Sequence, residues 1–183
     1  FISNQSSQTI QIIEKVLKGG IKIIQHRFKD GRDCDNLKKA LEIRKLCNKY
    51  KALFIVNDRI DIALASNADG VHLGQGDIDI KSARMILGFS KIIGVSANKS
   101  GDIKKALANG CDYLGVGPVF ETTTKKGKKP LGIEKIKKIK KSITIPFFLI
   151  GGIKKENIPI LIKNGFNKVA IISEIMDDDN PKN

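Results

Sequence analysis

Leu53–Asp77 reads LFIVNDRIDIALASNADGVHLGQGD and predicts one strand–helix–strand unit of a parallel sheet. Its apolar runs, Leu53–Val56 and Gly70–Leu73, are continuous rather than alternating, as in strands that helices cover on both faces. Between them, Asp61–Ser66 has a helical pattern that ends at Asn67, a residue type common at helix C-termini. A unit of this kind is typical of an α/β protein.

The same alternation continues toward both ends of the chain. Eight strands are predicted, at Phe1–Ser3, Ile21–Gln25, Leu53–Val56, Gly70–Leu73, Ile92–Val95, Tyr113–Val116, Phe147–Ile150 and Lys168–Ile171. Helical patterns separate them, at Thr9–Lys18, Asn36–Tyr50, Asp61–Ser66, Asp79–Leu87, Gly101–Asn109, Ile133–Lys140 and Lys155–Lys163. We therefore expect a compact (β/α)8 barrel of one domain, residues 1–183, with a truncated first strand and a short last helix. A doubly wound open sheet is the alternative, but it usually has fewer strands, and no GxGxxG follows the first one.

The net charge of +14 suggests three possible kinds of binding partner: nucleic acid, acidic membranes and small anionic substrates. Aromatic residues make up only 5% of the chain and tryptophan is absent, so stacking platforms for single-stranded nucleic acid are not expected. The densest basic run, Lys135–Lys141, has apolar residues at helical spacing and is typical of a solvated helix face. Nucleic acid is therefore a weak candidate, and no nucleic-acid partner is expected.

The cysteines and the apolar segments indicate the compartment. Cys34, Cys47 and Cys111 are widely spaced and form no CxxC pair, so neither a zinc site nor a disulfide framework is predicted. The longest apolar stretch, Ile145–Ile153, is far shorter than the ~20 residues that span a bilayer. We expect a cytoplasmic protein with no membrane partner. Because the chain starts at Phe1 rather than at Met, we also expect that part of the natural N-terminus is missing.

In a (β/α)8 barrel the chemistry lies at the C-terminal ends of the strands. The second strand runs into Gln25-His26-Arg27-Phe28-Lys29, and residues two apart in an extended segment share one face. Gln25, Arg27 and Lys29 can therefore present an amide, a guanidinium and an ammonium group to one diphosphate. A merely solvated strand end is an equally good interpretation of these residues alone. His26 points to the other face, where a structural role is expected.

Two carboxylates follow the next two strands. Asn57-Asp58 comes after the third and Asp77 after the fourth, and adjacent strands lie ~4.8 Å apart, so the two aspartates can approach one site. Two carboxylates with phosphate oxygens and water are the usual ligands of Mg2+. Each aspartate also precedes a predicted helix, and from the residues alone N-capping is the favoured interpretation.

Hydroxyl groups, lysines and glycines follow the remaining strands. Ser96 comes after the fifth strand. The loop Gly117–Gly127, after the sixth, carries Thr122, Thr124 and Lys125 and is predicted to be a flap over the substrate, with an exposed basic loop as the alternative. The seventh strand is followed by Gly151-Gly152, and the eighth ends near Ile172-Ser173. Loops after strands seven and eight form the usual phosphate site of this fold.

Taken in order, these segments resemble the thiamine-phosphate synthase family, also called thiamine-phosphate pyrophosphorylase. The matching segments are Gln25–Lys29, Leu53–Asp61, Ala68–Asp77, Ile93–Ala97, Asp112–Lys125, Ile150–Ile153 and Val169–Ser173. The resemblance covers nearly the whole chain. It implies a Mg2+-dependent transferase that joins hydroxymethylpyrimidine diphosphate to a thiazole phosphate, through a pyrimidine carbocation, with release of pyrophosphate.

The resemblance also implies roles for individual residues. The pyrimidine diphosphate would be bound by Gln25, Arg27, Lys29, Asn57, Ser96 and Lys125, with His72 near the pyrimidine ring. Asp58 and Asp77 would be the Mg2+ ligands. The thiazole phosphate would be bound by Thr122, Thr124, Gly151, Gly152, Ile172 and Ser173. Arg27, Lys29, Lys125 and Ser96 are the expected catalytic residues, because they would stabilise the leaving pyrophosphate.

The chain departs from the family pattern at three positions, Asn4, Asn98 and Glu121, none of which is an expected diphosphate or metal ligand. Two rival functions remain open. A thiazole tautomerase would lack the second metal carboxylate and would have a histidine where this chain has Asn98. A non-catalytic phosphate-binding homologue would lack one of Arg27, Asp58, Asp77 or Lys125. A homodimer is suggested by the resemblance alone.

Overall fold

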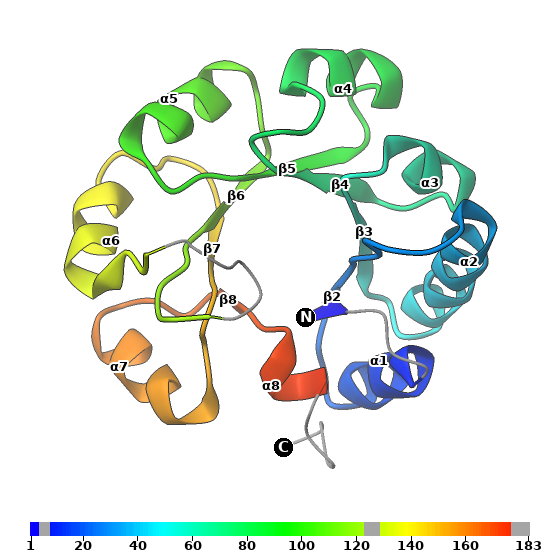
Figure 1. Cartoon of the computed structure of the whole chain (residues 1–183), viewed down its shortest axis with the longest axis horizontal. Helices are drawn as coiled ribbons and strands as arrows, with labels where there is room; N and C mark the ends of the chain where they lie inside the picture. The colour runs from blue at the N-terminus through cyan, green and yellow to red at the C-terminus, as the bar shows by residue number, and fades with distance from the viewer. Residues whose placement is uncertain (4–7, 123–128, 177–183) are drawn as a thin grey trace.

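Eight parallel strands follow one another in chain order, inside a ring of helices, in this computed structural model, which describes residues 1–3, 8–122 and 129–176 (Figure 1). The strands are β1 Ile2–Ser3, β2 Ile23–His26, β3 Leu53–Asn57, β4 Gly70–Leu73, β5 Ile92–Ser96, β6 Tyr113–Val116, β7 Phe147–Ile150 and β8 Val169–Ala170. Each strand pairs only with its neighbours in sequence, as in Asn57 opposite His72 between β3 and β4. The predicted (β/α)8 barrel is confirmed.

The helices lie outside the strands. They are α1 Thr9–Lys18, α2 Asp33–Lys49, α3 Ile60–Ala65, α4 Ile80–Leu87, α5 Ser100–Ala108, α6 Gly132–Lys140, α7 Ile158–Lys163 and α8 Ser173–Met176. One predicted helix, Lys155–Lys163, is wrong in its first part, where a 3-10 turn, η1 Lys155–Asn157, precedes α7. Pro159 lies in the first turn of α7, where its missing N–H is harmless and its fixed backbone favours a helix start.

The ring closes between its first and last strands. The backbone N–H of Ile2 donates to the carbonyl oxygen of Ile171, just beyond β8, at 3.0 Å. β1 and β8 are two residues each, and the described residues form no strand pairing between them, so the barrel is nearly closed at this seam. The short first strand and the short last helix agree with the prediction from the sequence.

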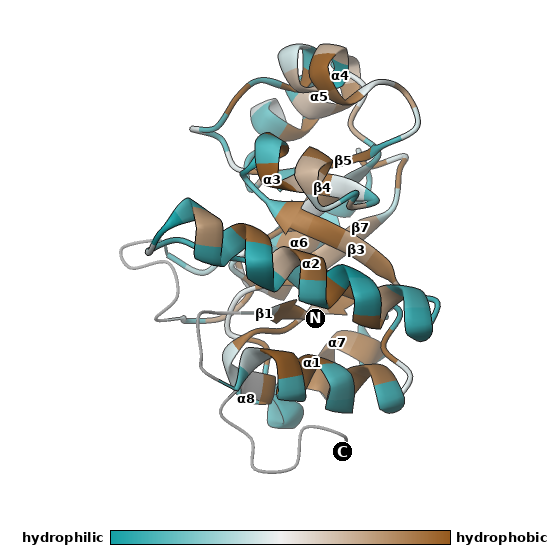
Figure 2. Ribbon diagram, turned by 90° about the vertical axis from the view of Figure 1, so that its right-hand side faces the viewer, coloured by the Kyte–Doolittle hydropathy of each residue, from teal (hydrophilic) through white to brown (hydrophobic). Residues whose placement is uncertain are grey.

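The hydrophobic core fills the layer between strands and helices. Phe54 and Val56 of β3 are fully buried there, and α1 contributes Ile13 and Val16 from its inner face. Figure 2 shows the resulting polarity, with hydrophilic residues along the outside of α1 and α2 and hydrophobic residues on β3. No described helix is long and apolar enough to cross a membrane. All three cysteines are free thiols, as predicted.

Charged residues at the N-terminal end of the barrel have structural partners. Asp112, before β6, accepts hydrogen bonds from the backbone N–H of Ile93 and from Arg84 of α4, both at 2.7 Å. Asp69, before β4, makes the same arrangement with β3 and with Arg44 of α2. Each carboxylate therefore ties a strand pair to a helix at the end of the barrel opposite to the loops that carry the candidate site.

Candidate active site

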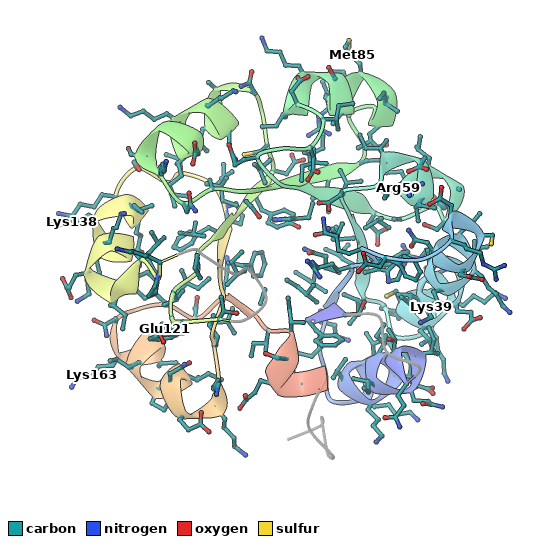
Figure 3. The ribbon with its side chains drawn as sticks, viewed as in Figure 1. Lys39, Arg59, Met85, Glu121, Lys138 and Lys163 are labelled. Carbon is teal, nitrogen blue, oxygen red and sulfur yellow. The ribbon has the colours of Figure 1, made fainter. Side chains whose placement is uncertain are left out.

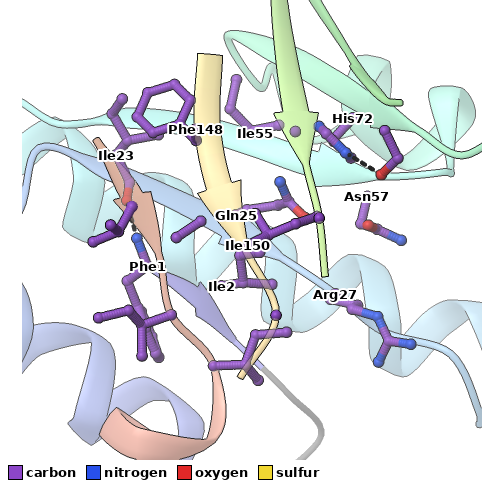
Figure 4. Close-up of a pocket in the computed structure, with 18 of the residues that line it drawn as sticks. Phe1, Ile2, Ile23, Gln25, Arg27, Ile55, Asn57, His72, Phe148 and Ile150 are labelled. Carbon is purple, nitrogen blue, oxygen red and sulfur yellow. Dashed lines mark hydrogen bonds between the residues drawn. The ribbon is translucent and has the colours of Figure 1, made fainter. Parts of the chain in front are cut away.

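A cavity of about 650 Å3 occupies the inside of the barrel. Its walls are apolar in the middle, where Ile23, Ile55 and Phe148 point inward, and polar toward the C-terminal ends of the strands (Figure 4). The predicted site residues that line it are Gln25, Arg27, Asn57, His72, Ser96, Thr122, Gly151, Gly152, Ile172 and Ser173. Residues from seven loops or strand ends therefore meet in one chamber.

The end of β2 separates its side chains onto two faces, as its period of two requires. Gln25 and Arg27 line the cavity, and Lys29 lies at the rim in an ion pair with Asp58. His26 faces away: its Nε2 lies 2.9 Å from Asn36 Oδ1, and burial lowers the pKa of its imidazole to about 4. One guanidinium and one amide thus face the cavity, Lys29 pairs with Asp58 beside it, and the histidine supports the loop.

Asp58 sits in a strained turn after β3. Its φ of 63° is rare for a residue other than glycine, although aspartate adopts it more readily than most. The backbone N–H of Arg59 donates to the carbonyl oxygen of Asn57 at 2.8 Å, which closes a three-residue turn around Asp58. The Asp58 N–H donates to the carbonyl oxygen of His72, also at 2.8 Å. These bonds hold the Asp58 carboxylate at the rim beside β4.

Asp77 approaches Asp58 from the next loop. One of its carboxylate oxygens accepts a hydrogen bond from the backbone N–H of Gly74 at 2.6 Å. Burial raises the pKa of the Asp77 carboxyl, and hydrogen bonding to Asp58 and repulsion from it raise the pKa further. Two carboxylates that disfavour each other's charge would gain from a cation between them, so the pair suits a divalent metal ion.

Neither of these two carboxylates caps a helix. The N-cap of α3 is Arg59, and that of α4 is Asp79, which accepts hydrogen bonds from Lys81 N at 3.0 Å and Ser82 N at 3.1 Å. The capping interpretation, which the residues alone favoured, is therefore wrong for both. Within the described ranges, no three or more histidine, cysteine, aspartate or glutamate side chains gather around one point. A metal ion here would take its other ligands from phosphate and water.

His72 is held from both sides inside the cavity. Its Nε2 lies 2.9 Å from the Ser96 hydroxyl and its Nδ1 lies 3.0 Å from the Tyr113 hydroxyl. Burial raises the pKa of Tyr113, against the effect of a hydrogen bond with Gln25. Gly94 makes room for this arrangement, since a Cβ there would lie 2.0 Å from the Tyr113 ring. The result is a buried polar wall that runs across β4, β5 and β6.

Sequence reasoning missed two members of this wall. Tyr113 was read only as part of a strand, although its spacing of two from the cavity-lining Gly115 places it on the inner face. Gln75 donates from its side-chain amide to the carbonyl oxygen of Ser96 at 2.6 Å and also lines the cavity. Gln75 lies within Leu53–Asp77, two residues before Asp77, but a glutamine in a loop does not by itself indicate a functional site.

Backbone turns after β7 form the side of the cavity that lies across the barrel from β3 (Figure 1). Gly151 and Gly152 both have positive φ, 89° and 67°, and a Cβ on Gly152 would lie 2.2 Å from the carbonyl oxygen of Glu121. Glycine is therefore required at Gly152 by backbone conformation and by space. Thr122 lies beside these turns in the cavity wall. Thr124, Lys125 and the rest of residues 123–127 of the predicted flap lie outside the described residues.

With this geometry established, comparison with known proteins identifies the family. A family model described as thiamine monophosphate synthase matches residues 1–175. The chain belongs to the thiamine monophosphate synthase family.

Individual members of the family show how far the similarity extends. Thiamine-phosphate synthase of Prochlorococcus marinus strain AS9601 is 61% identical over 181 residues, which are 99% of this chain and 52% of that protein. Thiamine-phosphate synthase of Persephonella marina is 47% identical over 93% of this chain and 81% of its own length. A solved thiamine phosphate pyrophosphorylase from Pyrococcus furiosus superposes with a TM-score of 0.89 at 34% identity, over 99% of this chain and 88% of that one. The chain spans about half the length of several curated relatives.

Two of the three departures from the thiamine monophosphate synthase pattern lie around the site without removing its charged residues. Asn98 lines the cavity just after Ser96, and the backbone of Glu121 packs against Gly152. Asn4 lies outside the described residues. The carboxylate pair and the basic end of β2 remain in place in this member of the family.

Proposed function

We propose that this chain joins 4-amino-2-methyl-5-hydroxymethylpyrimidine diphosphate to hydroxyethylthiazole phosphate, giving thiamine phosphate and pyrophosphate in a Mg2+-dependent reaction. The observation that carries the proposal is that Lys29, Asp58 and Asp77 interact with one another next to the cavity-lining residues Arg27, Asn57 and Gly74. A diphosphate with a divalent cation is the ligand that matches this combination of charges. The family membership supports the same reaction.

The diphosphate would bind along the end of β2. Arg27 offers a guanidinium fork to the phosphate oxygens, and the side-chain amide of Asn57 lies in the same part of the cavity wall. Lys29, which pairs with Asp58, is positioned to exchange that carboxylate for the diphosphate when a cation neutralises Asp58. Mg2+ held by Asp58 and Asp77 would supply charge neutralisation of the leaving pyrophosphate.

The pyrimidine ring would lie deeper, against the wall that His72, Ser96 and Tyr113 form. In the proposed reaction the bond between the pyrimidine methylene carbon and the diphosphate oxygen breaks, and its electron pair leaves with pyrophosphate. The thiazole nitrogen then donates its lone pair to the resulting carbocation. A protein nucleophile is not needed for this sequence of steps, so the enzyme acts by positioning and by electrostatic stabilisation.

The thiazole phosphate would bind at the opposite turns. Gly151 and Gly152 bring their backbone close to the cavity, and Ile172 and Ser173 follow β8 at the same level. Thr122 adds a hydroxyl group from the loop after β6. This location would place the thiazole in the same chamber as the pyrimidine, so that its nitrogen can reach the carbocation once pyrophosphate has left.

A thiazole tautomerase is the second candidate. It is disfavoured because Asp77 is present and lies beside Asp58, and because Asn98 rather than histidine follows Ser96. A non-catalytic phosphate-binding homologue would be expected to lose part of the charged rim, whereas Arg27, Asp58, Asp77 and Lys125 are all retained.

The test is to incubate the protein with both substrates and Mg2+ and to follow thiamine phosphate and pyrophosphate by chromatography. Asp58→Asn and Asp77→Asn should each lower turnover by about 100-fold or more, since metal stabilisation of a leaving phosphate is worth several kcal/mol. Circular dichroism should show both variants folded. Full activity in either variant would overturn the metal assignment, and no product from the unmodified protein would overturn the proposed function.

A further inference from the structure

Arg59 bridges the two loops that carry Lys29 and Asp58 without entering the cavity. Its Nε and Nη2 donate to the two oxygens of Asp61 at 2.9 Å and 2.5 Å, a two-pronged contact at the start of α3. Its Nη1 donates to Asp33, the first residue of α2, at 2.6 Å. Figure 3 shows Arg59 on the side of the barrel where α2 and α3 lie. Arg59 is not among the described residues that line the cavity.

The turn that Arg59 follows is the strained one. A residue other than glycine at positive φ persists only where the surrounding structure fixes it. Two backbone hydrogen bonds fix Asp58 on the cavity side, to His72 and across the turn from Arg59 to Asn57. The Arg59 side chain adds a third restraint on the outer side, and it is the only one of the three that a substitution can remove.

The contacts of Arg59 are better suited to orienting the neighbouring loops than to stabilising the fold. The side chains of Asp33 and Asp61 are 71% and 62% exposed, and exposed ion pairs contribute little to folding. A guanidinium that holds two carboxylates from two elements does, however, set the geometry between those elements. The start of α2 follows closely on Lys29 and the start of α3 follows closely on Asp58, so Arg59 fixes the distance across the predicted diphosphate and metal rim.

We propose that Arg59 is a positioning residue that holds the Asp58 carboxylate in place for a divalent cation by bridging Asp33 and Asp61. This inference rests on the proposed function for the metal role of Asp58. Arg59 acts through Asp58 and through the β2–α2 loop, and contacts neither substrate nor metal. Residues outside a metal's coordination shell can orient the ligands, and their substitution typically weakens metal binding ten- to a hundredfold. Arg59 would act on Asp58 in the same way.

Simple electrostatics predicts the opposite effect of removing Arg59 on cation binding. Replacing Arg59 by alanine removes a positive charge near the carboxylate pair, and by Coulomb's law alone that change should strengthen cation binding. Weaker binding in Arg59→Ala would therefore report lost positioning. Arg32 provides the matched control, because it is an exposed arginine near the same helix start and pairs with Asp35 within that segment.

The experiment measures Mn2+ binding to the full chain by calorimetry in the presence of inorganic pyrophosphate, since Mn2+ takes the same oxygen ligands as Mg2+. Arg59→Ala should weaken Mn2+ binding by about tenfold or more. Arg59→Lys should restore only part of the loss, because an ammonium group cannot make the two-pronged contact and reach Asp33 as well. Asp33→Ala should weaken binding, and adding it to Arg59→Ala should cause little further loss. Arg32→Ala should bind as the unmodified protein does.

The outcomes separate this inference from the proposed function. Asp58→Asn, measured alongside, should abolish Mn2+ binding; if it binds normally, the metal site itself is wrong. If Asp58→Asn fails to bind and Arg59→Ala binds as tightly as the unmodified protein or more tightly, only the positioning role is overturned. Urea unfolding of Arg59→Ala should have a midpoint close to that of the unmodified protein. If Arg59→Ala is partly unfolded, Asp33→Ala decides: weaker Mn2+ binding in a folded Asp33→Ala variant supports the positioning role, and normal binding overturns it.

Discussion

The hydroxyl group of Tyr113 lies 3.0 Å from Nδ1 of His72, inside the barrel. This contact fixes the orientation of the imidazole ring and so the position of Nε2, which faces the Ser96 hydroxyl. Tyr113→Phe should keep the ring and lose the hydrogen bond. Since a buried polar group left without its partner costs about 1–3 kcal/mol, we expect a loss of roughly tenfold in kcat/KM for the pyrimidine substrate.

Tyr50 is the control for that substitution, because it is the other tyrosine of the chain and its hydroxyl donates to Glu14 on the outside of the barrel. Tyr50→Phe should leave the kinetics unchanged. Equal kinetics for Tyr113→Phe and the unmodified protein would show that the Tyr113–His72 contact does not matter for the reaction.

The buried His26 should make folding stability depend on pH. Its pKa is about 4 in the folded protein, against 6.5 when unperturbed, because burial disfavours the charged ring. Above pH 6.5 both states are neutral at this residue and the effect is absent. As the pH falls from 6.5 toward 4, the unfolded chain takes up a proton that the folded protein does not, so stability is lost, by about 2 kcal/mol at pH 5.

Urea unfolding of the unmodified protein and of His26→Gln, each at pH 7.5 and pH 5, measures the contribution of His26 to this loss of stability. The variant should lose less stability between the two values, while His72, the other histidine, is common to both proteins. If both proteins lose the same amount, His26 does not titrate as its burial implies.

Gly152→Ala should damage the predicted thiazole phosphate side. The added Cβ would meet the carbonyl oxygen of Glu121 at 2.2 Å, and the φ of 67° strains any residue with a side chain. We expect KM for the thiazole phosphate to rise by about tenfold or more, because the turn must move away from its present position. Gly88→Ala is the control, since Gly88 has a φ of 73° with open space around it at the end of α4. A rise in KM of the same size in Gly88→Ala would point to general backbone strain as the cause.

Asp79→Ala should affect stability without affecting catalysis. Its carboxylate caps α4, and loss of such a cap costs about 1 kcal/mol. Turnover should stay near that of the unmodified protein, in contrast to the expected loss in Asp77→Asn, two residues earlier. Thermal unfolding and steady-state rates on the two variants would distinguish them, and a large loss of turnover in Asp79→Ala would mean that the site extends further along this loop than we infer.

The fold could be predicted because its signal is repeated. Each apolar run such as Leu53–Val56 is followed by an amphipathic stretch, and the regular alternation leaves few architectures. The boundary error at Lys155–Lys163 arose from Pro159, which favours the first turn of a helix but does not show that a separate turn precedes it. Short structural variations of this kind depend on tertiary contacts that periodicity does not record.

The site could be predicted in part. The period of two along β2 placed Gln25 and Arg27 on the cavity face and His26 on the other. Asp58 and Asp77 were ambiguous because metal ligands and helix caps occupy the same position, just after a strand. The structure excludes the capping interpretation, since Arg59 and Asp79 are the N-caps of α3 and α4, and the metal role of Asp58 and Asp77 stays a prediction. The position of Tyr113 in the cavity was not predicted, because tyrosine is common in strands whether or not it lines a site.

The left-handed backbone at Asp58 restricts the residue types that fit this position more than the proposed metal role alone would. Glycine, asparagine and aspartate are the residues that accept such a conformation at least cost. Aspartate and glutamate are the ones that offer a carboxylate. Only aspartate belongs to both sets, so it is the residue that satisfies both the backbone conformation and the proposed metal role. Asp77 is not among the described residues with positive φ, and its neighbourhood leaves more freedom to vary.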